Sequence, residues 1–156
     1  MAWLTIGPLW LAGGCYALGV GSAVLPWLNA ELLLLSALSL TSSLPATLAV
    51  VVAITAGQMT GKTAVYLTAR RVGGGKSVRV KVALDRWRRL VEARPAAALG
   101  LVFVSAVVGM PPFYVVSLAA GATGMALRRF LVVGTCGRLL HFSAVACLPD
   151  VIRRIF

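Results

Sequence analysis

Residues 43–69 read SLPATLAVVVAITAGQMTGKTAVYLTA, and Lys62 is the only charged residue among them. A helix needs about 20 mainly apolar residues to cross the hydrocarbon core of a bilayer. This stretch is long enough, and its G-x-x-x-G spacing at Gly57 and Gly61 would let a neighbouring backbone approach closely. It predicts a membrane-spanning helix over about 44–69 with a packing face made of small residues.

The middle of the stretch, AGQMTGKT at 56–63, also has the spacing of a phosphate-binding loop. Such a loop follows a buried strand, opens a helix in a parallel sheet and works with an acidic ligand for magnesium. Neither Asp85 nor Asp150 follows a strand-like run. We therefore expect that this stretch does not bind a nucleotide. ATP binding that is lost in Lys62→Ala would revive that hypothesis.

The composition of the whole chain indicates an integral membrane protein. Of its 156 residues 60% are hydrophobic and 12% charged, and the mean hydropathy is +0.93. A soluble domain is nearer half apolar and a quarter charged. No charge occurs in 1–30, 32–61 or 95–127. The N-terminal segment lacks the positively charged region that precedes the apolar stretch of a signal peptide, so we expect this segment to be retained rather than cleaved.

Prolines interrupt two of these apolar windows. Pro26 lies in GSAVLPWLNAELLLLSAL, and Pro111 and Pro112 lie in VVGMPPFYVVSLAAGATGM. A proline breaks or kinks a helix, and breaks at corresponding positions of two halves predict an inverted repeat. The expected fold is therefore all-α, a polytopic transmembrane protein with two proline-broken re-entrant hairpins in an inverted repeat. We expect a single membrane domain over 1–156, with a first hairpin and span over 9–69, a connector over 70–94, and a second hairpin and span over 95–149.

The connector carries most of the positive charge. The net charge is +11, and ten of the 15 basic residues lie between Lys62 and Arg94. Four apolar residues recur within it at helical spacing: Val80, Leu84, Trp87 and Val91. A basic amphipathic helix of this kind suits anionic headgroups at the cytoplasmic membrane surface better than nucleic acid. The alternative is an anchor that only fixes the topology.

A few polar residues fall inside apolar segments, where ionisable groups are costly and often functional. Glu31 is either a proton or headgroup site or, after an N-cap at Asn29, a favourable charge at a helix start. Arg138 and His141 share a helix face. Arg138 could pair with Glu31 or with a lipid phosphate, or it could lie near an interface. His141 alone is more typical of packing than of proton transfer.

Other residues are expected to pack or anchor helices. Lys62 could extend its side chain to the headgroups, and Tyr66 and Arg70 share a face at the interface. Gly121 and Gly137 would join Gly57 and Gly61 in close helix packing.

The three cysteines are scattered through apolar stretches and predict neither a disulfide framework nor a metal site. No catalytic set of residues can be assembled. We therefore expect no enzymatic activity, no cofactor and no metal.

Three segments, taken in order, resemble one family. LPWLNAELLLLSAL resembles the first hairpin of the DedA/VTT family, also called the SNARE-associated Golgi protein domain. GQMTGKTAVYLTARRVG resembles its G-x-x-x-G-x-x-x-x-Y-x-x-x-R-x-x-G element. MPPFYVVSLAAGATGMALRRFLVVGTCGRLLHF resembles its second hairpin and the span that follows. The resemblance covers about Pro26 to Phe142.

The resemblance implies a bacterial inner-membrane protein that moves lipids, as family members are linked to lipid-carrier recycling and phospholipid scrambling. The family's acidic residue would be Glu31, and its later motif positions would be Gly57, Gly61, Tyr66, Arg70, Gly137 and Arg138. Many bacterial members carry two arginines around the second hairpin tip, whereas VVGMPPFYVVS has no basic residue. An arginine-dependent, proton-coupled cycle is therefore not expected in this smaller, divergent member.

The function expected from the sequence is translocation or scrambling of a lipid, such as a lipid phosphate, between membrane leaflets. One alternative is a proton-coupled transporter of small solutes or ions that uses Glu31, and another is a non-transporting membrane assembly protein. A homo-oligomer is compatible with each. The residues expected to line the path are Pro26, Asn29, Glu31, Pro111, Pro112, Arg138 and His141.

Overall fold

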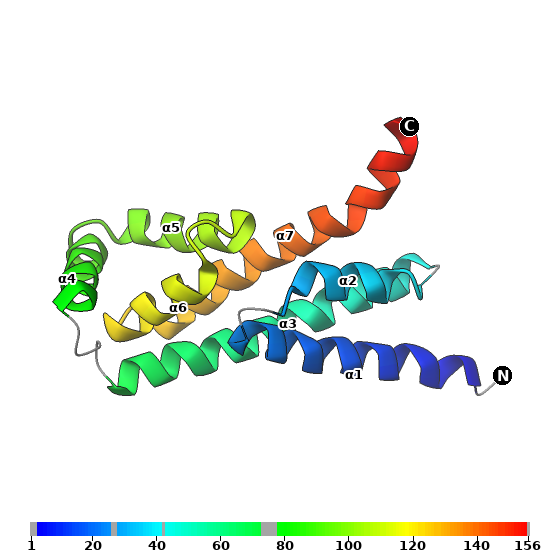
Figure 1. Ribbon diagram of the computed structural model, residues 1–156, viewed down its shortest axis with the longest axis horizontal. Helices are drawn as coiled ribbons and strands as arrows, with labels where there is room; N and C mark the ends of the chain where they lie inside the picture. The colour runs from blue at the N-terminus through cyan, green and yellow to red at the C-terminus, as the bar shows by residue number, and fades with distance from the viewer. Residues whose placement is uncertain (1–2, 26–27, 42, 73–77, 156) are drawn as a thin grey trace. The chain divides into compact units, whose positions relative to one another are not determined.

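The computed structural model describes residues 3–25, 28–41, 43–72 and 78–155, and within these ranges the chain is helical without strands (Figure 1). This confirms the all-α prediction. The helices are α1 (Trp3–Val24), α2 (Ala30–Leu38), α3 (Leu44–Val72), α4 (Val78–Ala93), α5 (Pro95–Val108), α6 (Phe113–Ala122) and α7 (Leu127–Ile155).

The chain divides into two compact units. Unit 1 comprises Met1–Gly61 and Arg138–Phe156, and unit 2 comprises Lys62–Gly137. The long helices α3 and α7 each contribute to both units, and the units are described one at a time below. A single membrane domain over 1–156 stays a prediction.

Two helices are long and apolar enough to cross a bilayer: Leu44–Val72 and Leu127–Pro149. The sequence predicted a span over about 44–69, and α3 begins there and continues to Val72. The second long helix, α7, continues past Pro149. Large apolar side chains point outward along both helices. Leu48, Val52, Val132 and Leu140 are all exposed. Exposed apolar faces of this kind are typical of lipid-facing surfaces.

The first break lies between Val24, where α1 ends, and Ala30, where α2 begins. Pro26 is outside the described residues. The Asn29 side chain caps α2, because its Oδ1 accepts hydrogen bonds from the backbone N–H groups of Glu31 and Leu32. This satisfies donors that the first turn of a helix otherwise leaves open.

The second break is built differently. Helix α5 ends at Val108 and is capped by Gly109, whose φ of 81° is a left-handed conformation that glycine adopts without steric cost. Pro111 and Pro112 follow, and α6 begins at Phe113 with no side-chain hydrogen bond at its cap. The hydroxyl of Ser105, on α5, donates to the Pro111 carbonyl at 2.5 Å. A side chain thus satisfies a backbone acceptor within the break.

Small residues bring the helices of unit 1 close together. A Cβ on Gly61 would lie 2.5 Å from the Cβ of Ala23, and one on Gly57 would collide with the Tyr16 carbonyl. Contact this close between α1 and α3 is the use that small residues serve in membrane helices. A buried hydrogen bond from Gln58 Nε2 to Ser22 Oγ, at 3.1 Å, joins the same two helices. The buried core beside it consists of Cys15, Ala30, Leu34, Ala37, Val50, Val51, Ile54 and Phe142.

Unit 2 uses the same device. A Cβ on Gly137 of α7 would lie 2.6 Å from the Cβ of Ala106 on α5. A Cβ on Gly121 of α6 would collide with the carbonyl oxygen of Tyr66 on α3. Both glycines were expected to pack helices, and both lie where any side chain would force the backbones apart.

Four of the buried residues on each long helix recur at the same spacing. On α3 these are Ile54, Gly61, Lys62 and Tyr66, and on α7 they are Phe130, Gly137, Arg138 and Phe142. The spacing along the chain is identical in the two sets. Their glycines also meet matching partners, since Gly61 faces Val20 and Ala23 on α1 while Gly137 faces Phe103 and Ala106 on α5.

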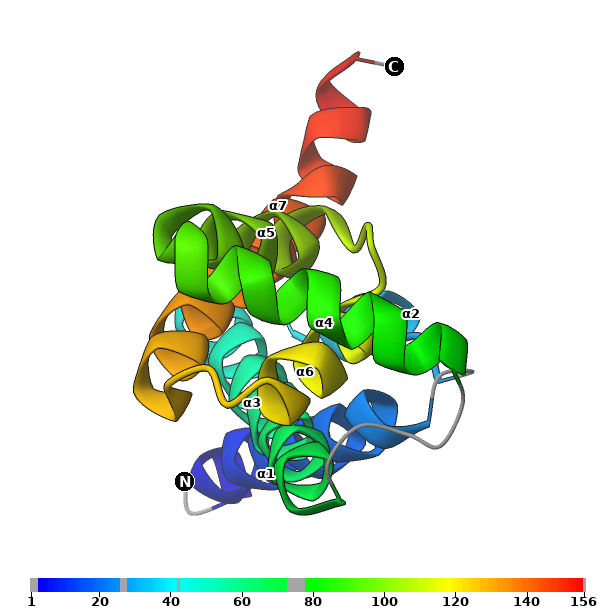
Figure 2. The ribbon, with the colours of Figure 1, turned by 90° about the vertical axis from the view of Figure 1, so that its left-hand side faces the viewer.

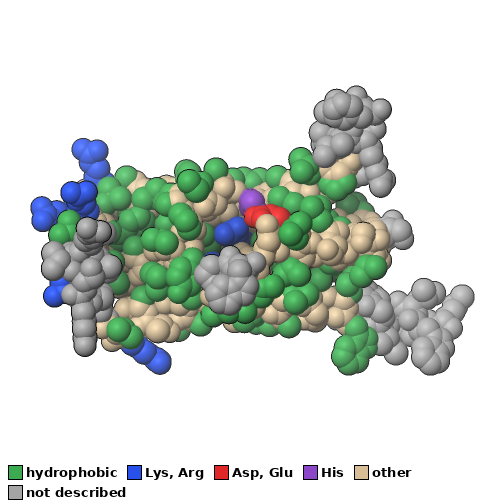
Figure 3. Space-filling model, in the orientation of Figure 1, with side chains coloured by type: hydrophobic (Ala, Val, Ile, Leu, Met, Phe, Trp, Pro, Cys, Tyr) green, Lys and Arg blue, Asp and Glu red, His purple; other side chains and the backbone are tan. Residues whose placement is uncertain are grey.

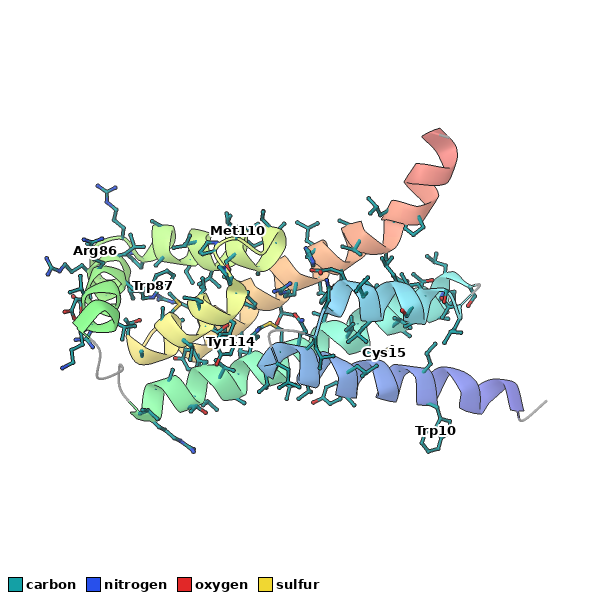
Figure 4. All side chains as sticks on the ribbon, in the orientation of Figure 1. Trp10, Cys15, Arg86, Trp87, Met110 and Tyr114 are labelled. Carbon is teal, nitrogen blue, oxygen red and sulfur yellow. The ribbon has the colours of Figure 1, made fainter. Side chains whose placement is uncertain are left out.

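Helix α4 lies across α5 and α6 within unit 2 (Figures 1 and 2). Arg86 points away from these helices and Trp87 points toward them (Figure 4). Leu84, Trp87 and Val91 are half-buried, as the predicted apolar stripe requires, and the side chain of Val80 is outside the described residues. The exposed cations along the helix and at its end are Lys81, Arg86, Arg88, Arg89 and Arg94.

Gly61→Ala should destabilise the fold, because the added methyl overlaps Ala23 in a tightly packed contact. We expect a loss of about 1–3 kcal/mol, seen as a lower thermal unfolding midpoint in detergent. Gly14→Ala is the matched control on α1, where a Cβ would meet no atom. Equal midpoints for the two variants would contradict the close contact of α1 and α3.

Candidate functional site

The polar centre of unit 1 is formed by α2 and α7. Glu31 lies in the first turn of α2, just after the Asn29 cap. Its Oε1 is 3.0 Å from Nε2 of His141 on α7, and the two side chains are 43% and 16% exposed respectively. The carboxylate is therefore held by the imidazole yet remains accessible from outside the helices.

Arg138 completes this centre. It lies one helical turn before His141, is 8% exposed, and interacts electrostatically with Glu31. Its guanidinium carbon lies 5.8 Å from the centroid of the Phe142 ring. We call Glu31, Arg138 and His141 the acid–base cluster.

Charge balance explains how Arg138 can be buried. Removing a cation from water costs several kcal/mol even after relaxation, so it needs an opposing charge or strong hydrogen bonds. A ring contact supplies only about 0.5–2 kcal/mol. The Glu31 carboxylate supplies the opposing charge. In Figure 3 the acidic and histidine side chains lie side by side among hydrophobic and other side chains, with a basic side chain next to them, and further basic side chains lie around α4.

Unit 2 contains a second buried cation. Lys62 is 5% exposed, and its Nζ lies 5.1 Å from the centroid of the Tyr114 ring. Tyr114 is the second residue of α6, as Glu31 is the second residue of α2 (Figure 4). We call this pair the Lys62–Tyr114 site.

Aromatic stacking lies beside this site. The rings of Tyr66 and Phe130 stack with centroids 5.2 Å apart, and Phe113 stacks on Phe130 at 5.9 Å. The Tyr66 hydroxyl donates a hydrogen bond to the Met125 carbonyl. This hydrogen bond joins α3 to the turn between α6 and α7, and the Tyr66 side chain that makes it is completely buried.

The structure brings some predicted site residues together and leaves others apart. Glu31, Arg138 and His141 come together in unit 1, and Asn29 caps the helix that carries Glu31. Pro111 and Pro112 belong to unit 2 and are exposed in the break between α5 and α6. Lys62 and Tyr66, which were expected at the membrane interface, are both buried, while Arg70 is exposed.

Sequence reasoning did not single out Tyr114. The signal was present, because Gly-Lys at 61–62 and Gly-Arg at 137–138 are each followed four residues later by an aromatic side chain. Aligning residues 61–66 with 137–142 would have shown that α3 and α7 correspond to each other. The short helices α2 and α6 would then also correspond, and so would their second residues, Glu31 and Tyr114. Within the described residues, no three His, Cys, Asp or Glu side chains come together to hold a metal ion.

Comparison with known proteins identifies the family. A family model described as the VTT domain matches residues 25–149. The chain belongs to the VTT-domain family. This confirms the resemblance seen in the sequence. The match includes α2 through most of α7, and therefore both buried cations, while α1 precedes it. No curated protein and no solved structure gave a match.

Membership gives the chain a general setting. VTT-domain proteins are membrane-associated and linked to transport, and the VTT domain is not a known enzyme family. The two apolar helices of the present VTT domain, α3 and the first part of α7, agree with integration into a membrane.

Tyr66→Phe should cost more stability than an equivalent change at the surface. It leaves the Met125 carbonyl without its phenolic donor, a loss expected to be about 1–3 kcal/mol for a buried acceptor. Tyr16→Phe is the matched control, because the Tyr16 hydroxyl bonds to Thr60 at an exposed position. Its effect should stay within about 0.5 kcal/mol. Thermal unfolding in detergent measures both, and the same midpoint in both variants would contradict the structural role of Tyr66.

Proposed function

We propose that this VTT-domain protein moves lipids between the two leaflets of a membrane, and that the acid–base cluster of unit 1 handles the phosphate of the headgroup. The observation that carries the proposal is the contact of Glu31 with His141 next to the buried Arg138, in a unit that exposes large apolar side chains such as Leu32, Leu48 and Val52. A headgroup needs polar partners on its way across, while its acyl chains can stay in lipid.

The geometry suggests how charge is exchanged during passage. A guanidinium binds phosphate oxygens through two parallel hydrogen bonds. When a headgroup phosphate takes Arg138 from Glu31, the carboxylate keeps His141 as its partner at 3.0 Å. Neither the cation nor the carboxylate is then left alone in an apolar setting, where an isolated charge is most costly. When the lipid leaves, Glu31 faces Arg138 again.

The shared pattern of α3 and α7 supports an inverted repeat for this route. Matching glycines, cations and aromatic residues recur on the two helices, and each unit combines one short helix with parts of both. In transporters built from inverted repeats, broken helices supply binding sites at the repeat interface. We take α2 and α6, each preceded by a break, as the corresponding elements of two re-entrant hairpins.

The exposed cations of α4 suit an anionic membrane surface. Each Lys or Arg near such a surface contributes about 1 kcal/mol of attraction, and positive loops tend to remain on the cytoplasmic side. The proposal therefore places α4 against the cytoplasmic leaflet of a bacterial inner membrane.

Glu31→Gln and Arg138→Ala should each abolish most lipid movement. Purified protein would be reconstituted in liposomes with a trace of headgroup-labelled lipid, and an impermeant reductant would bleach the label. Wild type should bleach well beyond half of the label. The two variants should be slower by about tenfold or more, the loss expected when a charge-assisted hydrogen bond is removed from the rate-limiting step.

Two exposed residues of α4 provide matched controls. Glu92→Gln and Arg89→Ala remove the same charges from positions outside the cluster and should bleach like wild type. Bleaching by wild type that stops at half, as in empty liposomes, would contradict the proposed function. Equal losses in the cluster variants and the α4 variants would show that the effect does not arise in the cluster.

A second candidate function rests on the Glu31–His141 pair itself. A carboxylate bonded to an imidazole can pass a proton, because histidine changes charge near neutral pH. Proton-coupled transport of a small solute or ion would therefore also use this pair. Acidification of liposomes that depends on an added solute and is lost in Glu31→Gln, without any lipid movement, would favour it.

A further inference from the structure

A cavity lies in unit 1, on the side of α2 that faces α7. Its volume is about 430 Å³, which is within the range of sites for small molecules. Its described lining residues come from α2, the turn after it, the start of α3 and α7, and they include Leu35, Leu38, Ser39, Thr41, Thr47 and Pro149. The cavity therefore belongs to the same unit and the same pair of helices as the acid–base cluster.

The cavity begins one helical turn from that cluster. Leu35 is four residues after Glu31, so the two side chains share a face of α2 and lie about 6 Å apart along its axis. On α7, Pro149 is eight residues after His141, or about 12 Å along the helix. A lipid headgroup whose phosphate meets Arg138 can therefore extend between α2 and α7 into the cavity.

Two hydroxyl groups at the cavity offer acceptors rather than donors. The Ser39 hydroxyl donates its proton to the Ser36 carbonyl at 2.8 Å, and the Thr41 hydroxyl donates to the Leu38 carbonyl at 3.0 Å. A hydroxyl has one proton and two lone pairs. Because both protons are bound to carbonyls of α2, these two oxygens have only lone pairs left for a ligand.

The backbone around the cavity has the same character. Ser39 is the C-cap of α2, and the C-terminal end of a helix carries partial negative charge. Pro149 has no N–H, so the carbonyl of Val145, four residues earlier on α7, lacks the donor that an uninterrupted helix supplies. No charged side chain is among the lining residues that the structure describes. The cavity thus combines several acceptors and needs a donor from elsewhere.

From these observations we propose that this cavity, the acceptor cavity, binds the hydrogen-bond donor group at the end of a lipid headgroup. The donor is either a primary ammonium, as in ethanolamine, or a hydroxyl, as in glycerol. The oxygens of Ser39 and Thr41 and the Val145 carbonyl accept from it. A trimethylammonium group has no N–H or O–H, so a choline headgroup gains none of these hydrogen bonds. The acceptor cavity therefore selects among headgroups by their donors.

This inference rests on the proposed function, because it takes the ligand to be a lipid. The acid–base cluster meets the phosphate that all these headgroups share, and the acceptor cavity meets the part in which they differ. Binding and movement can be measured separately, so each of the two proposals can fail without the other.

Calorimetric titration of the full-length protein in a nonionic detergent tests the acceptor cavity. The probes are dihexanoyl phosphatidylethanolamine, phosphatidylglycerol and phosphatidylcholine below their micellar concentrations. They share their acyl chains and their phosphate, and they differ in the end of the headgroup. Wild type should bind phosphatidylethanolamine, phosphatidylglycerol or both at least about fivefold more tightly than phosphatidylcholine, as expected when a hydrogen bond or two is gained.

Variants of the lining residues should remove this preference. Ser39→Ala and Thr41→Val each delete an acceptor, and Pro149→Ala returns a backbone donor to the Val145 carbonyl. Each should bring the affinity for the preferred lipid to within about twofold of that for phosphatidylcholine, whose own affinity stays unchanged. A purely structural defect would instead weaken the binding of all three lipids alike.

Two further variants serve as controls. Thr68→Val deletes a hydroxyl that donates to the Ala64 carbonyl at 2.9 Å on an exposed part of α3 in unit 2, and it should keep the wild-type preference. Arg138→Ala should weaken all three lipids, because they share the phosphate. Size-exclusion elution like that of wild type confirms that each variant is folded.

The outcomes separate the possible conclusions. A preference for phosphatidylethanolamine alone assigns the acceptor cavity to ammonium groups, one for phosphatidylglycerol alone assigns it to hydroxyl groups, and a preference for both assigns it to donors in general. The proposal is overturned if wild type binds none of the lipids or does not favour either donor-bearing lipid over phosphatidylcholine. A preference that persists in Ser39→Ala, Thr41→Val and Pro149→Ala overturns it as well.

The lipid-movement assay distinguishes this proposal from the proposed function. A preference that depends on the acceptor cavity, combined with bleaching that stops at half, would sustain the cavity as a binding site and remove lipid movement. Bleaching beyond half, combined with equal affinities for the three lipids, would sustain lipid movement and remove the role of the cavity.

Discussion

Burial of a cation is the constraint on which each half of this protein depends. Lys62 and Arg138 follow glycines in the middle of long apolar helices, and both side chains are almost completely buried. The glycines remove side-chain bulk where a neighbouring helix must come close, and the cations require partners that an apolar core does not supply. The short helices α2 and α6 supply them, Glu31 by charge and Tyr114 by its ring.

The all-helical fold, the long apolar helix α3 and the places where prolines interrupt apolar segments could be predicted from the sequence, because uncharged windows and prolines are properties of single segments. The packing role of Gly57 and Gly61 could also be predicted, since G-x-x-x-G is a local spacing. The partners of the buried cations could not be predicted in the same way. Glu31 and His141 are separated by 110 residues, and nothing local distinguishes an imidazole that meets a carboxylate from one that packs.

The burial of Tyr66 and Lys62 shows a second limit of local reasoning. Near the end of an apolar run, tyrosine and lysine are typical of a membrane interface. Here the helix continues to Val72, and both side chains are buried within unit 2. Arg70, one turn further on, is the exposed residue. Tyr66 packs against Gly121 and stacks on Phe130, and only the tertiary structure reveals these contacts.

The hydrogen bond from Ser105 to the Pro111 carbonyl bears on which surroundings the break between α5 and α6 can tolerate. Two successive prolines remove backbone donors but keep their carbonyl acceptors, and inside a bilayer those acceptors have no bulk solvent to turn to. In a soluble protein an ordered water molecule commonly fills that need. Here a hydroxyl fixed to α5 does so, and this acceptor requires no hydration. The Pro111 carbonyl therefore keeps a hydrogen-bond partner whether water or lipid surrounds the break, so this backbone group does not decide which of the two the break can face.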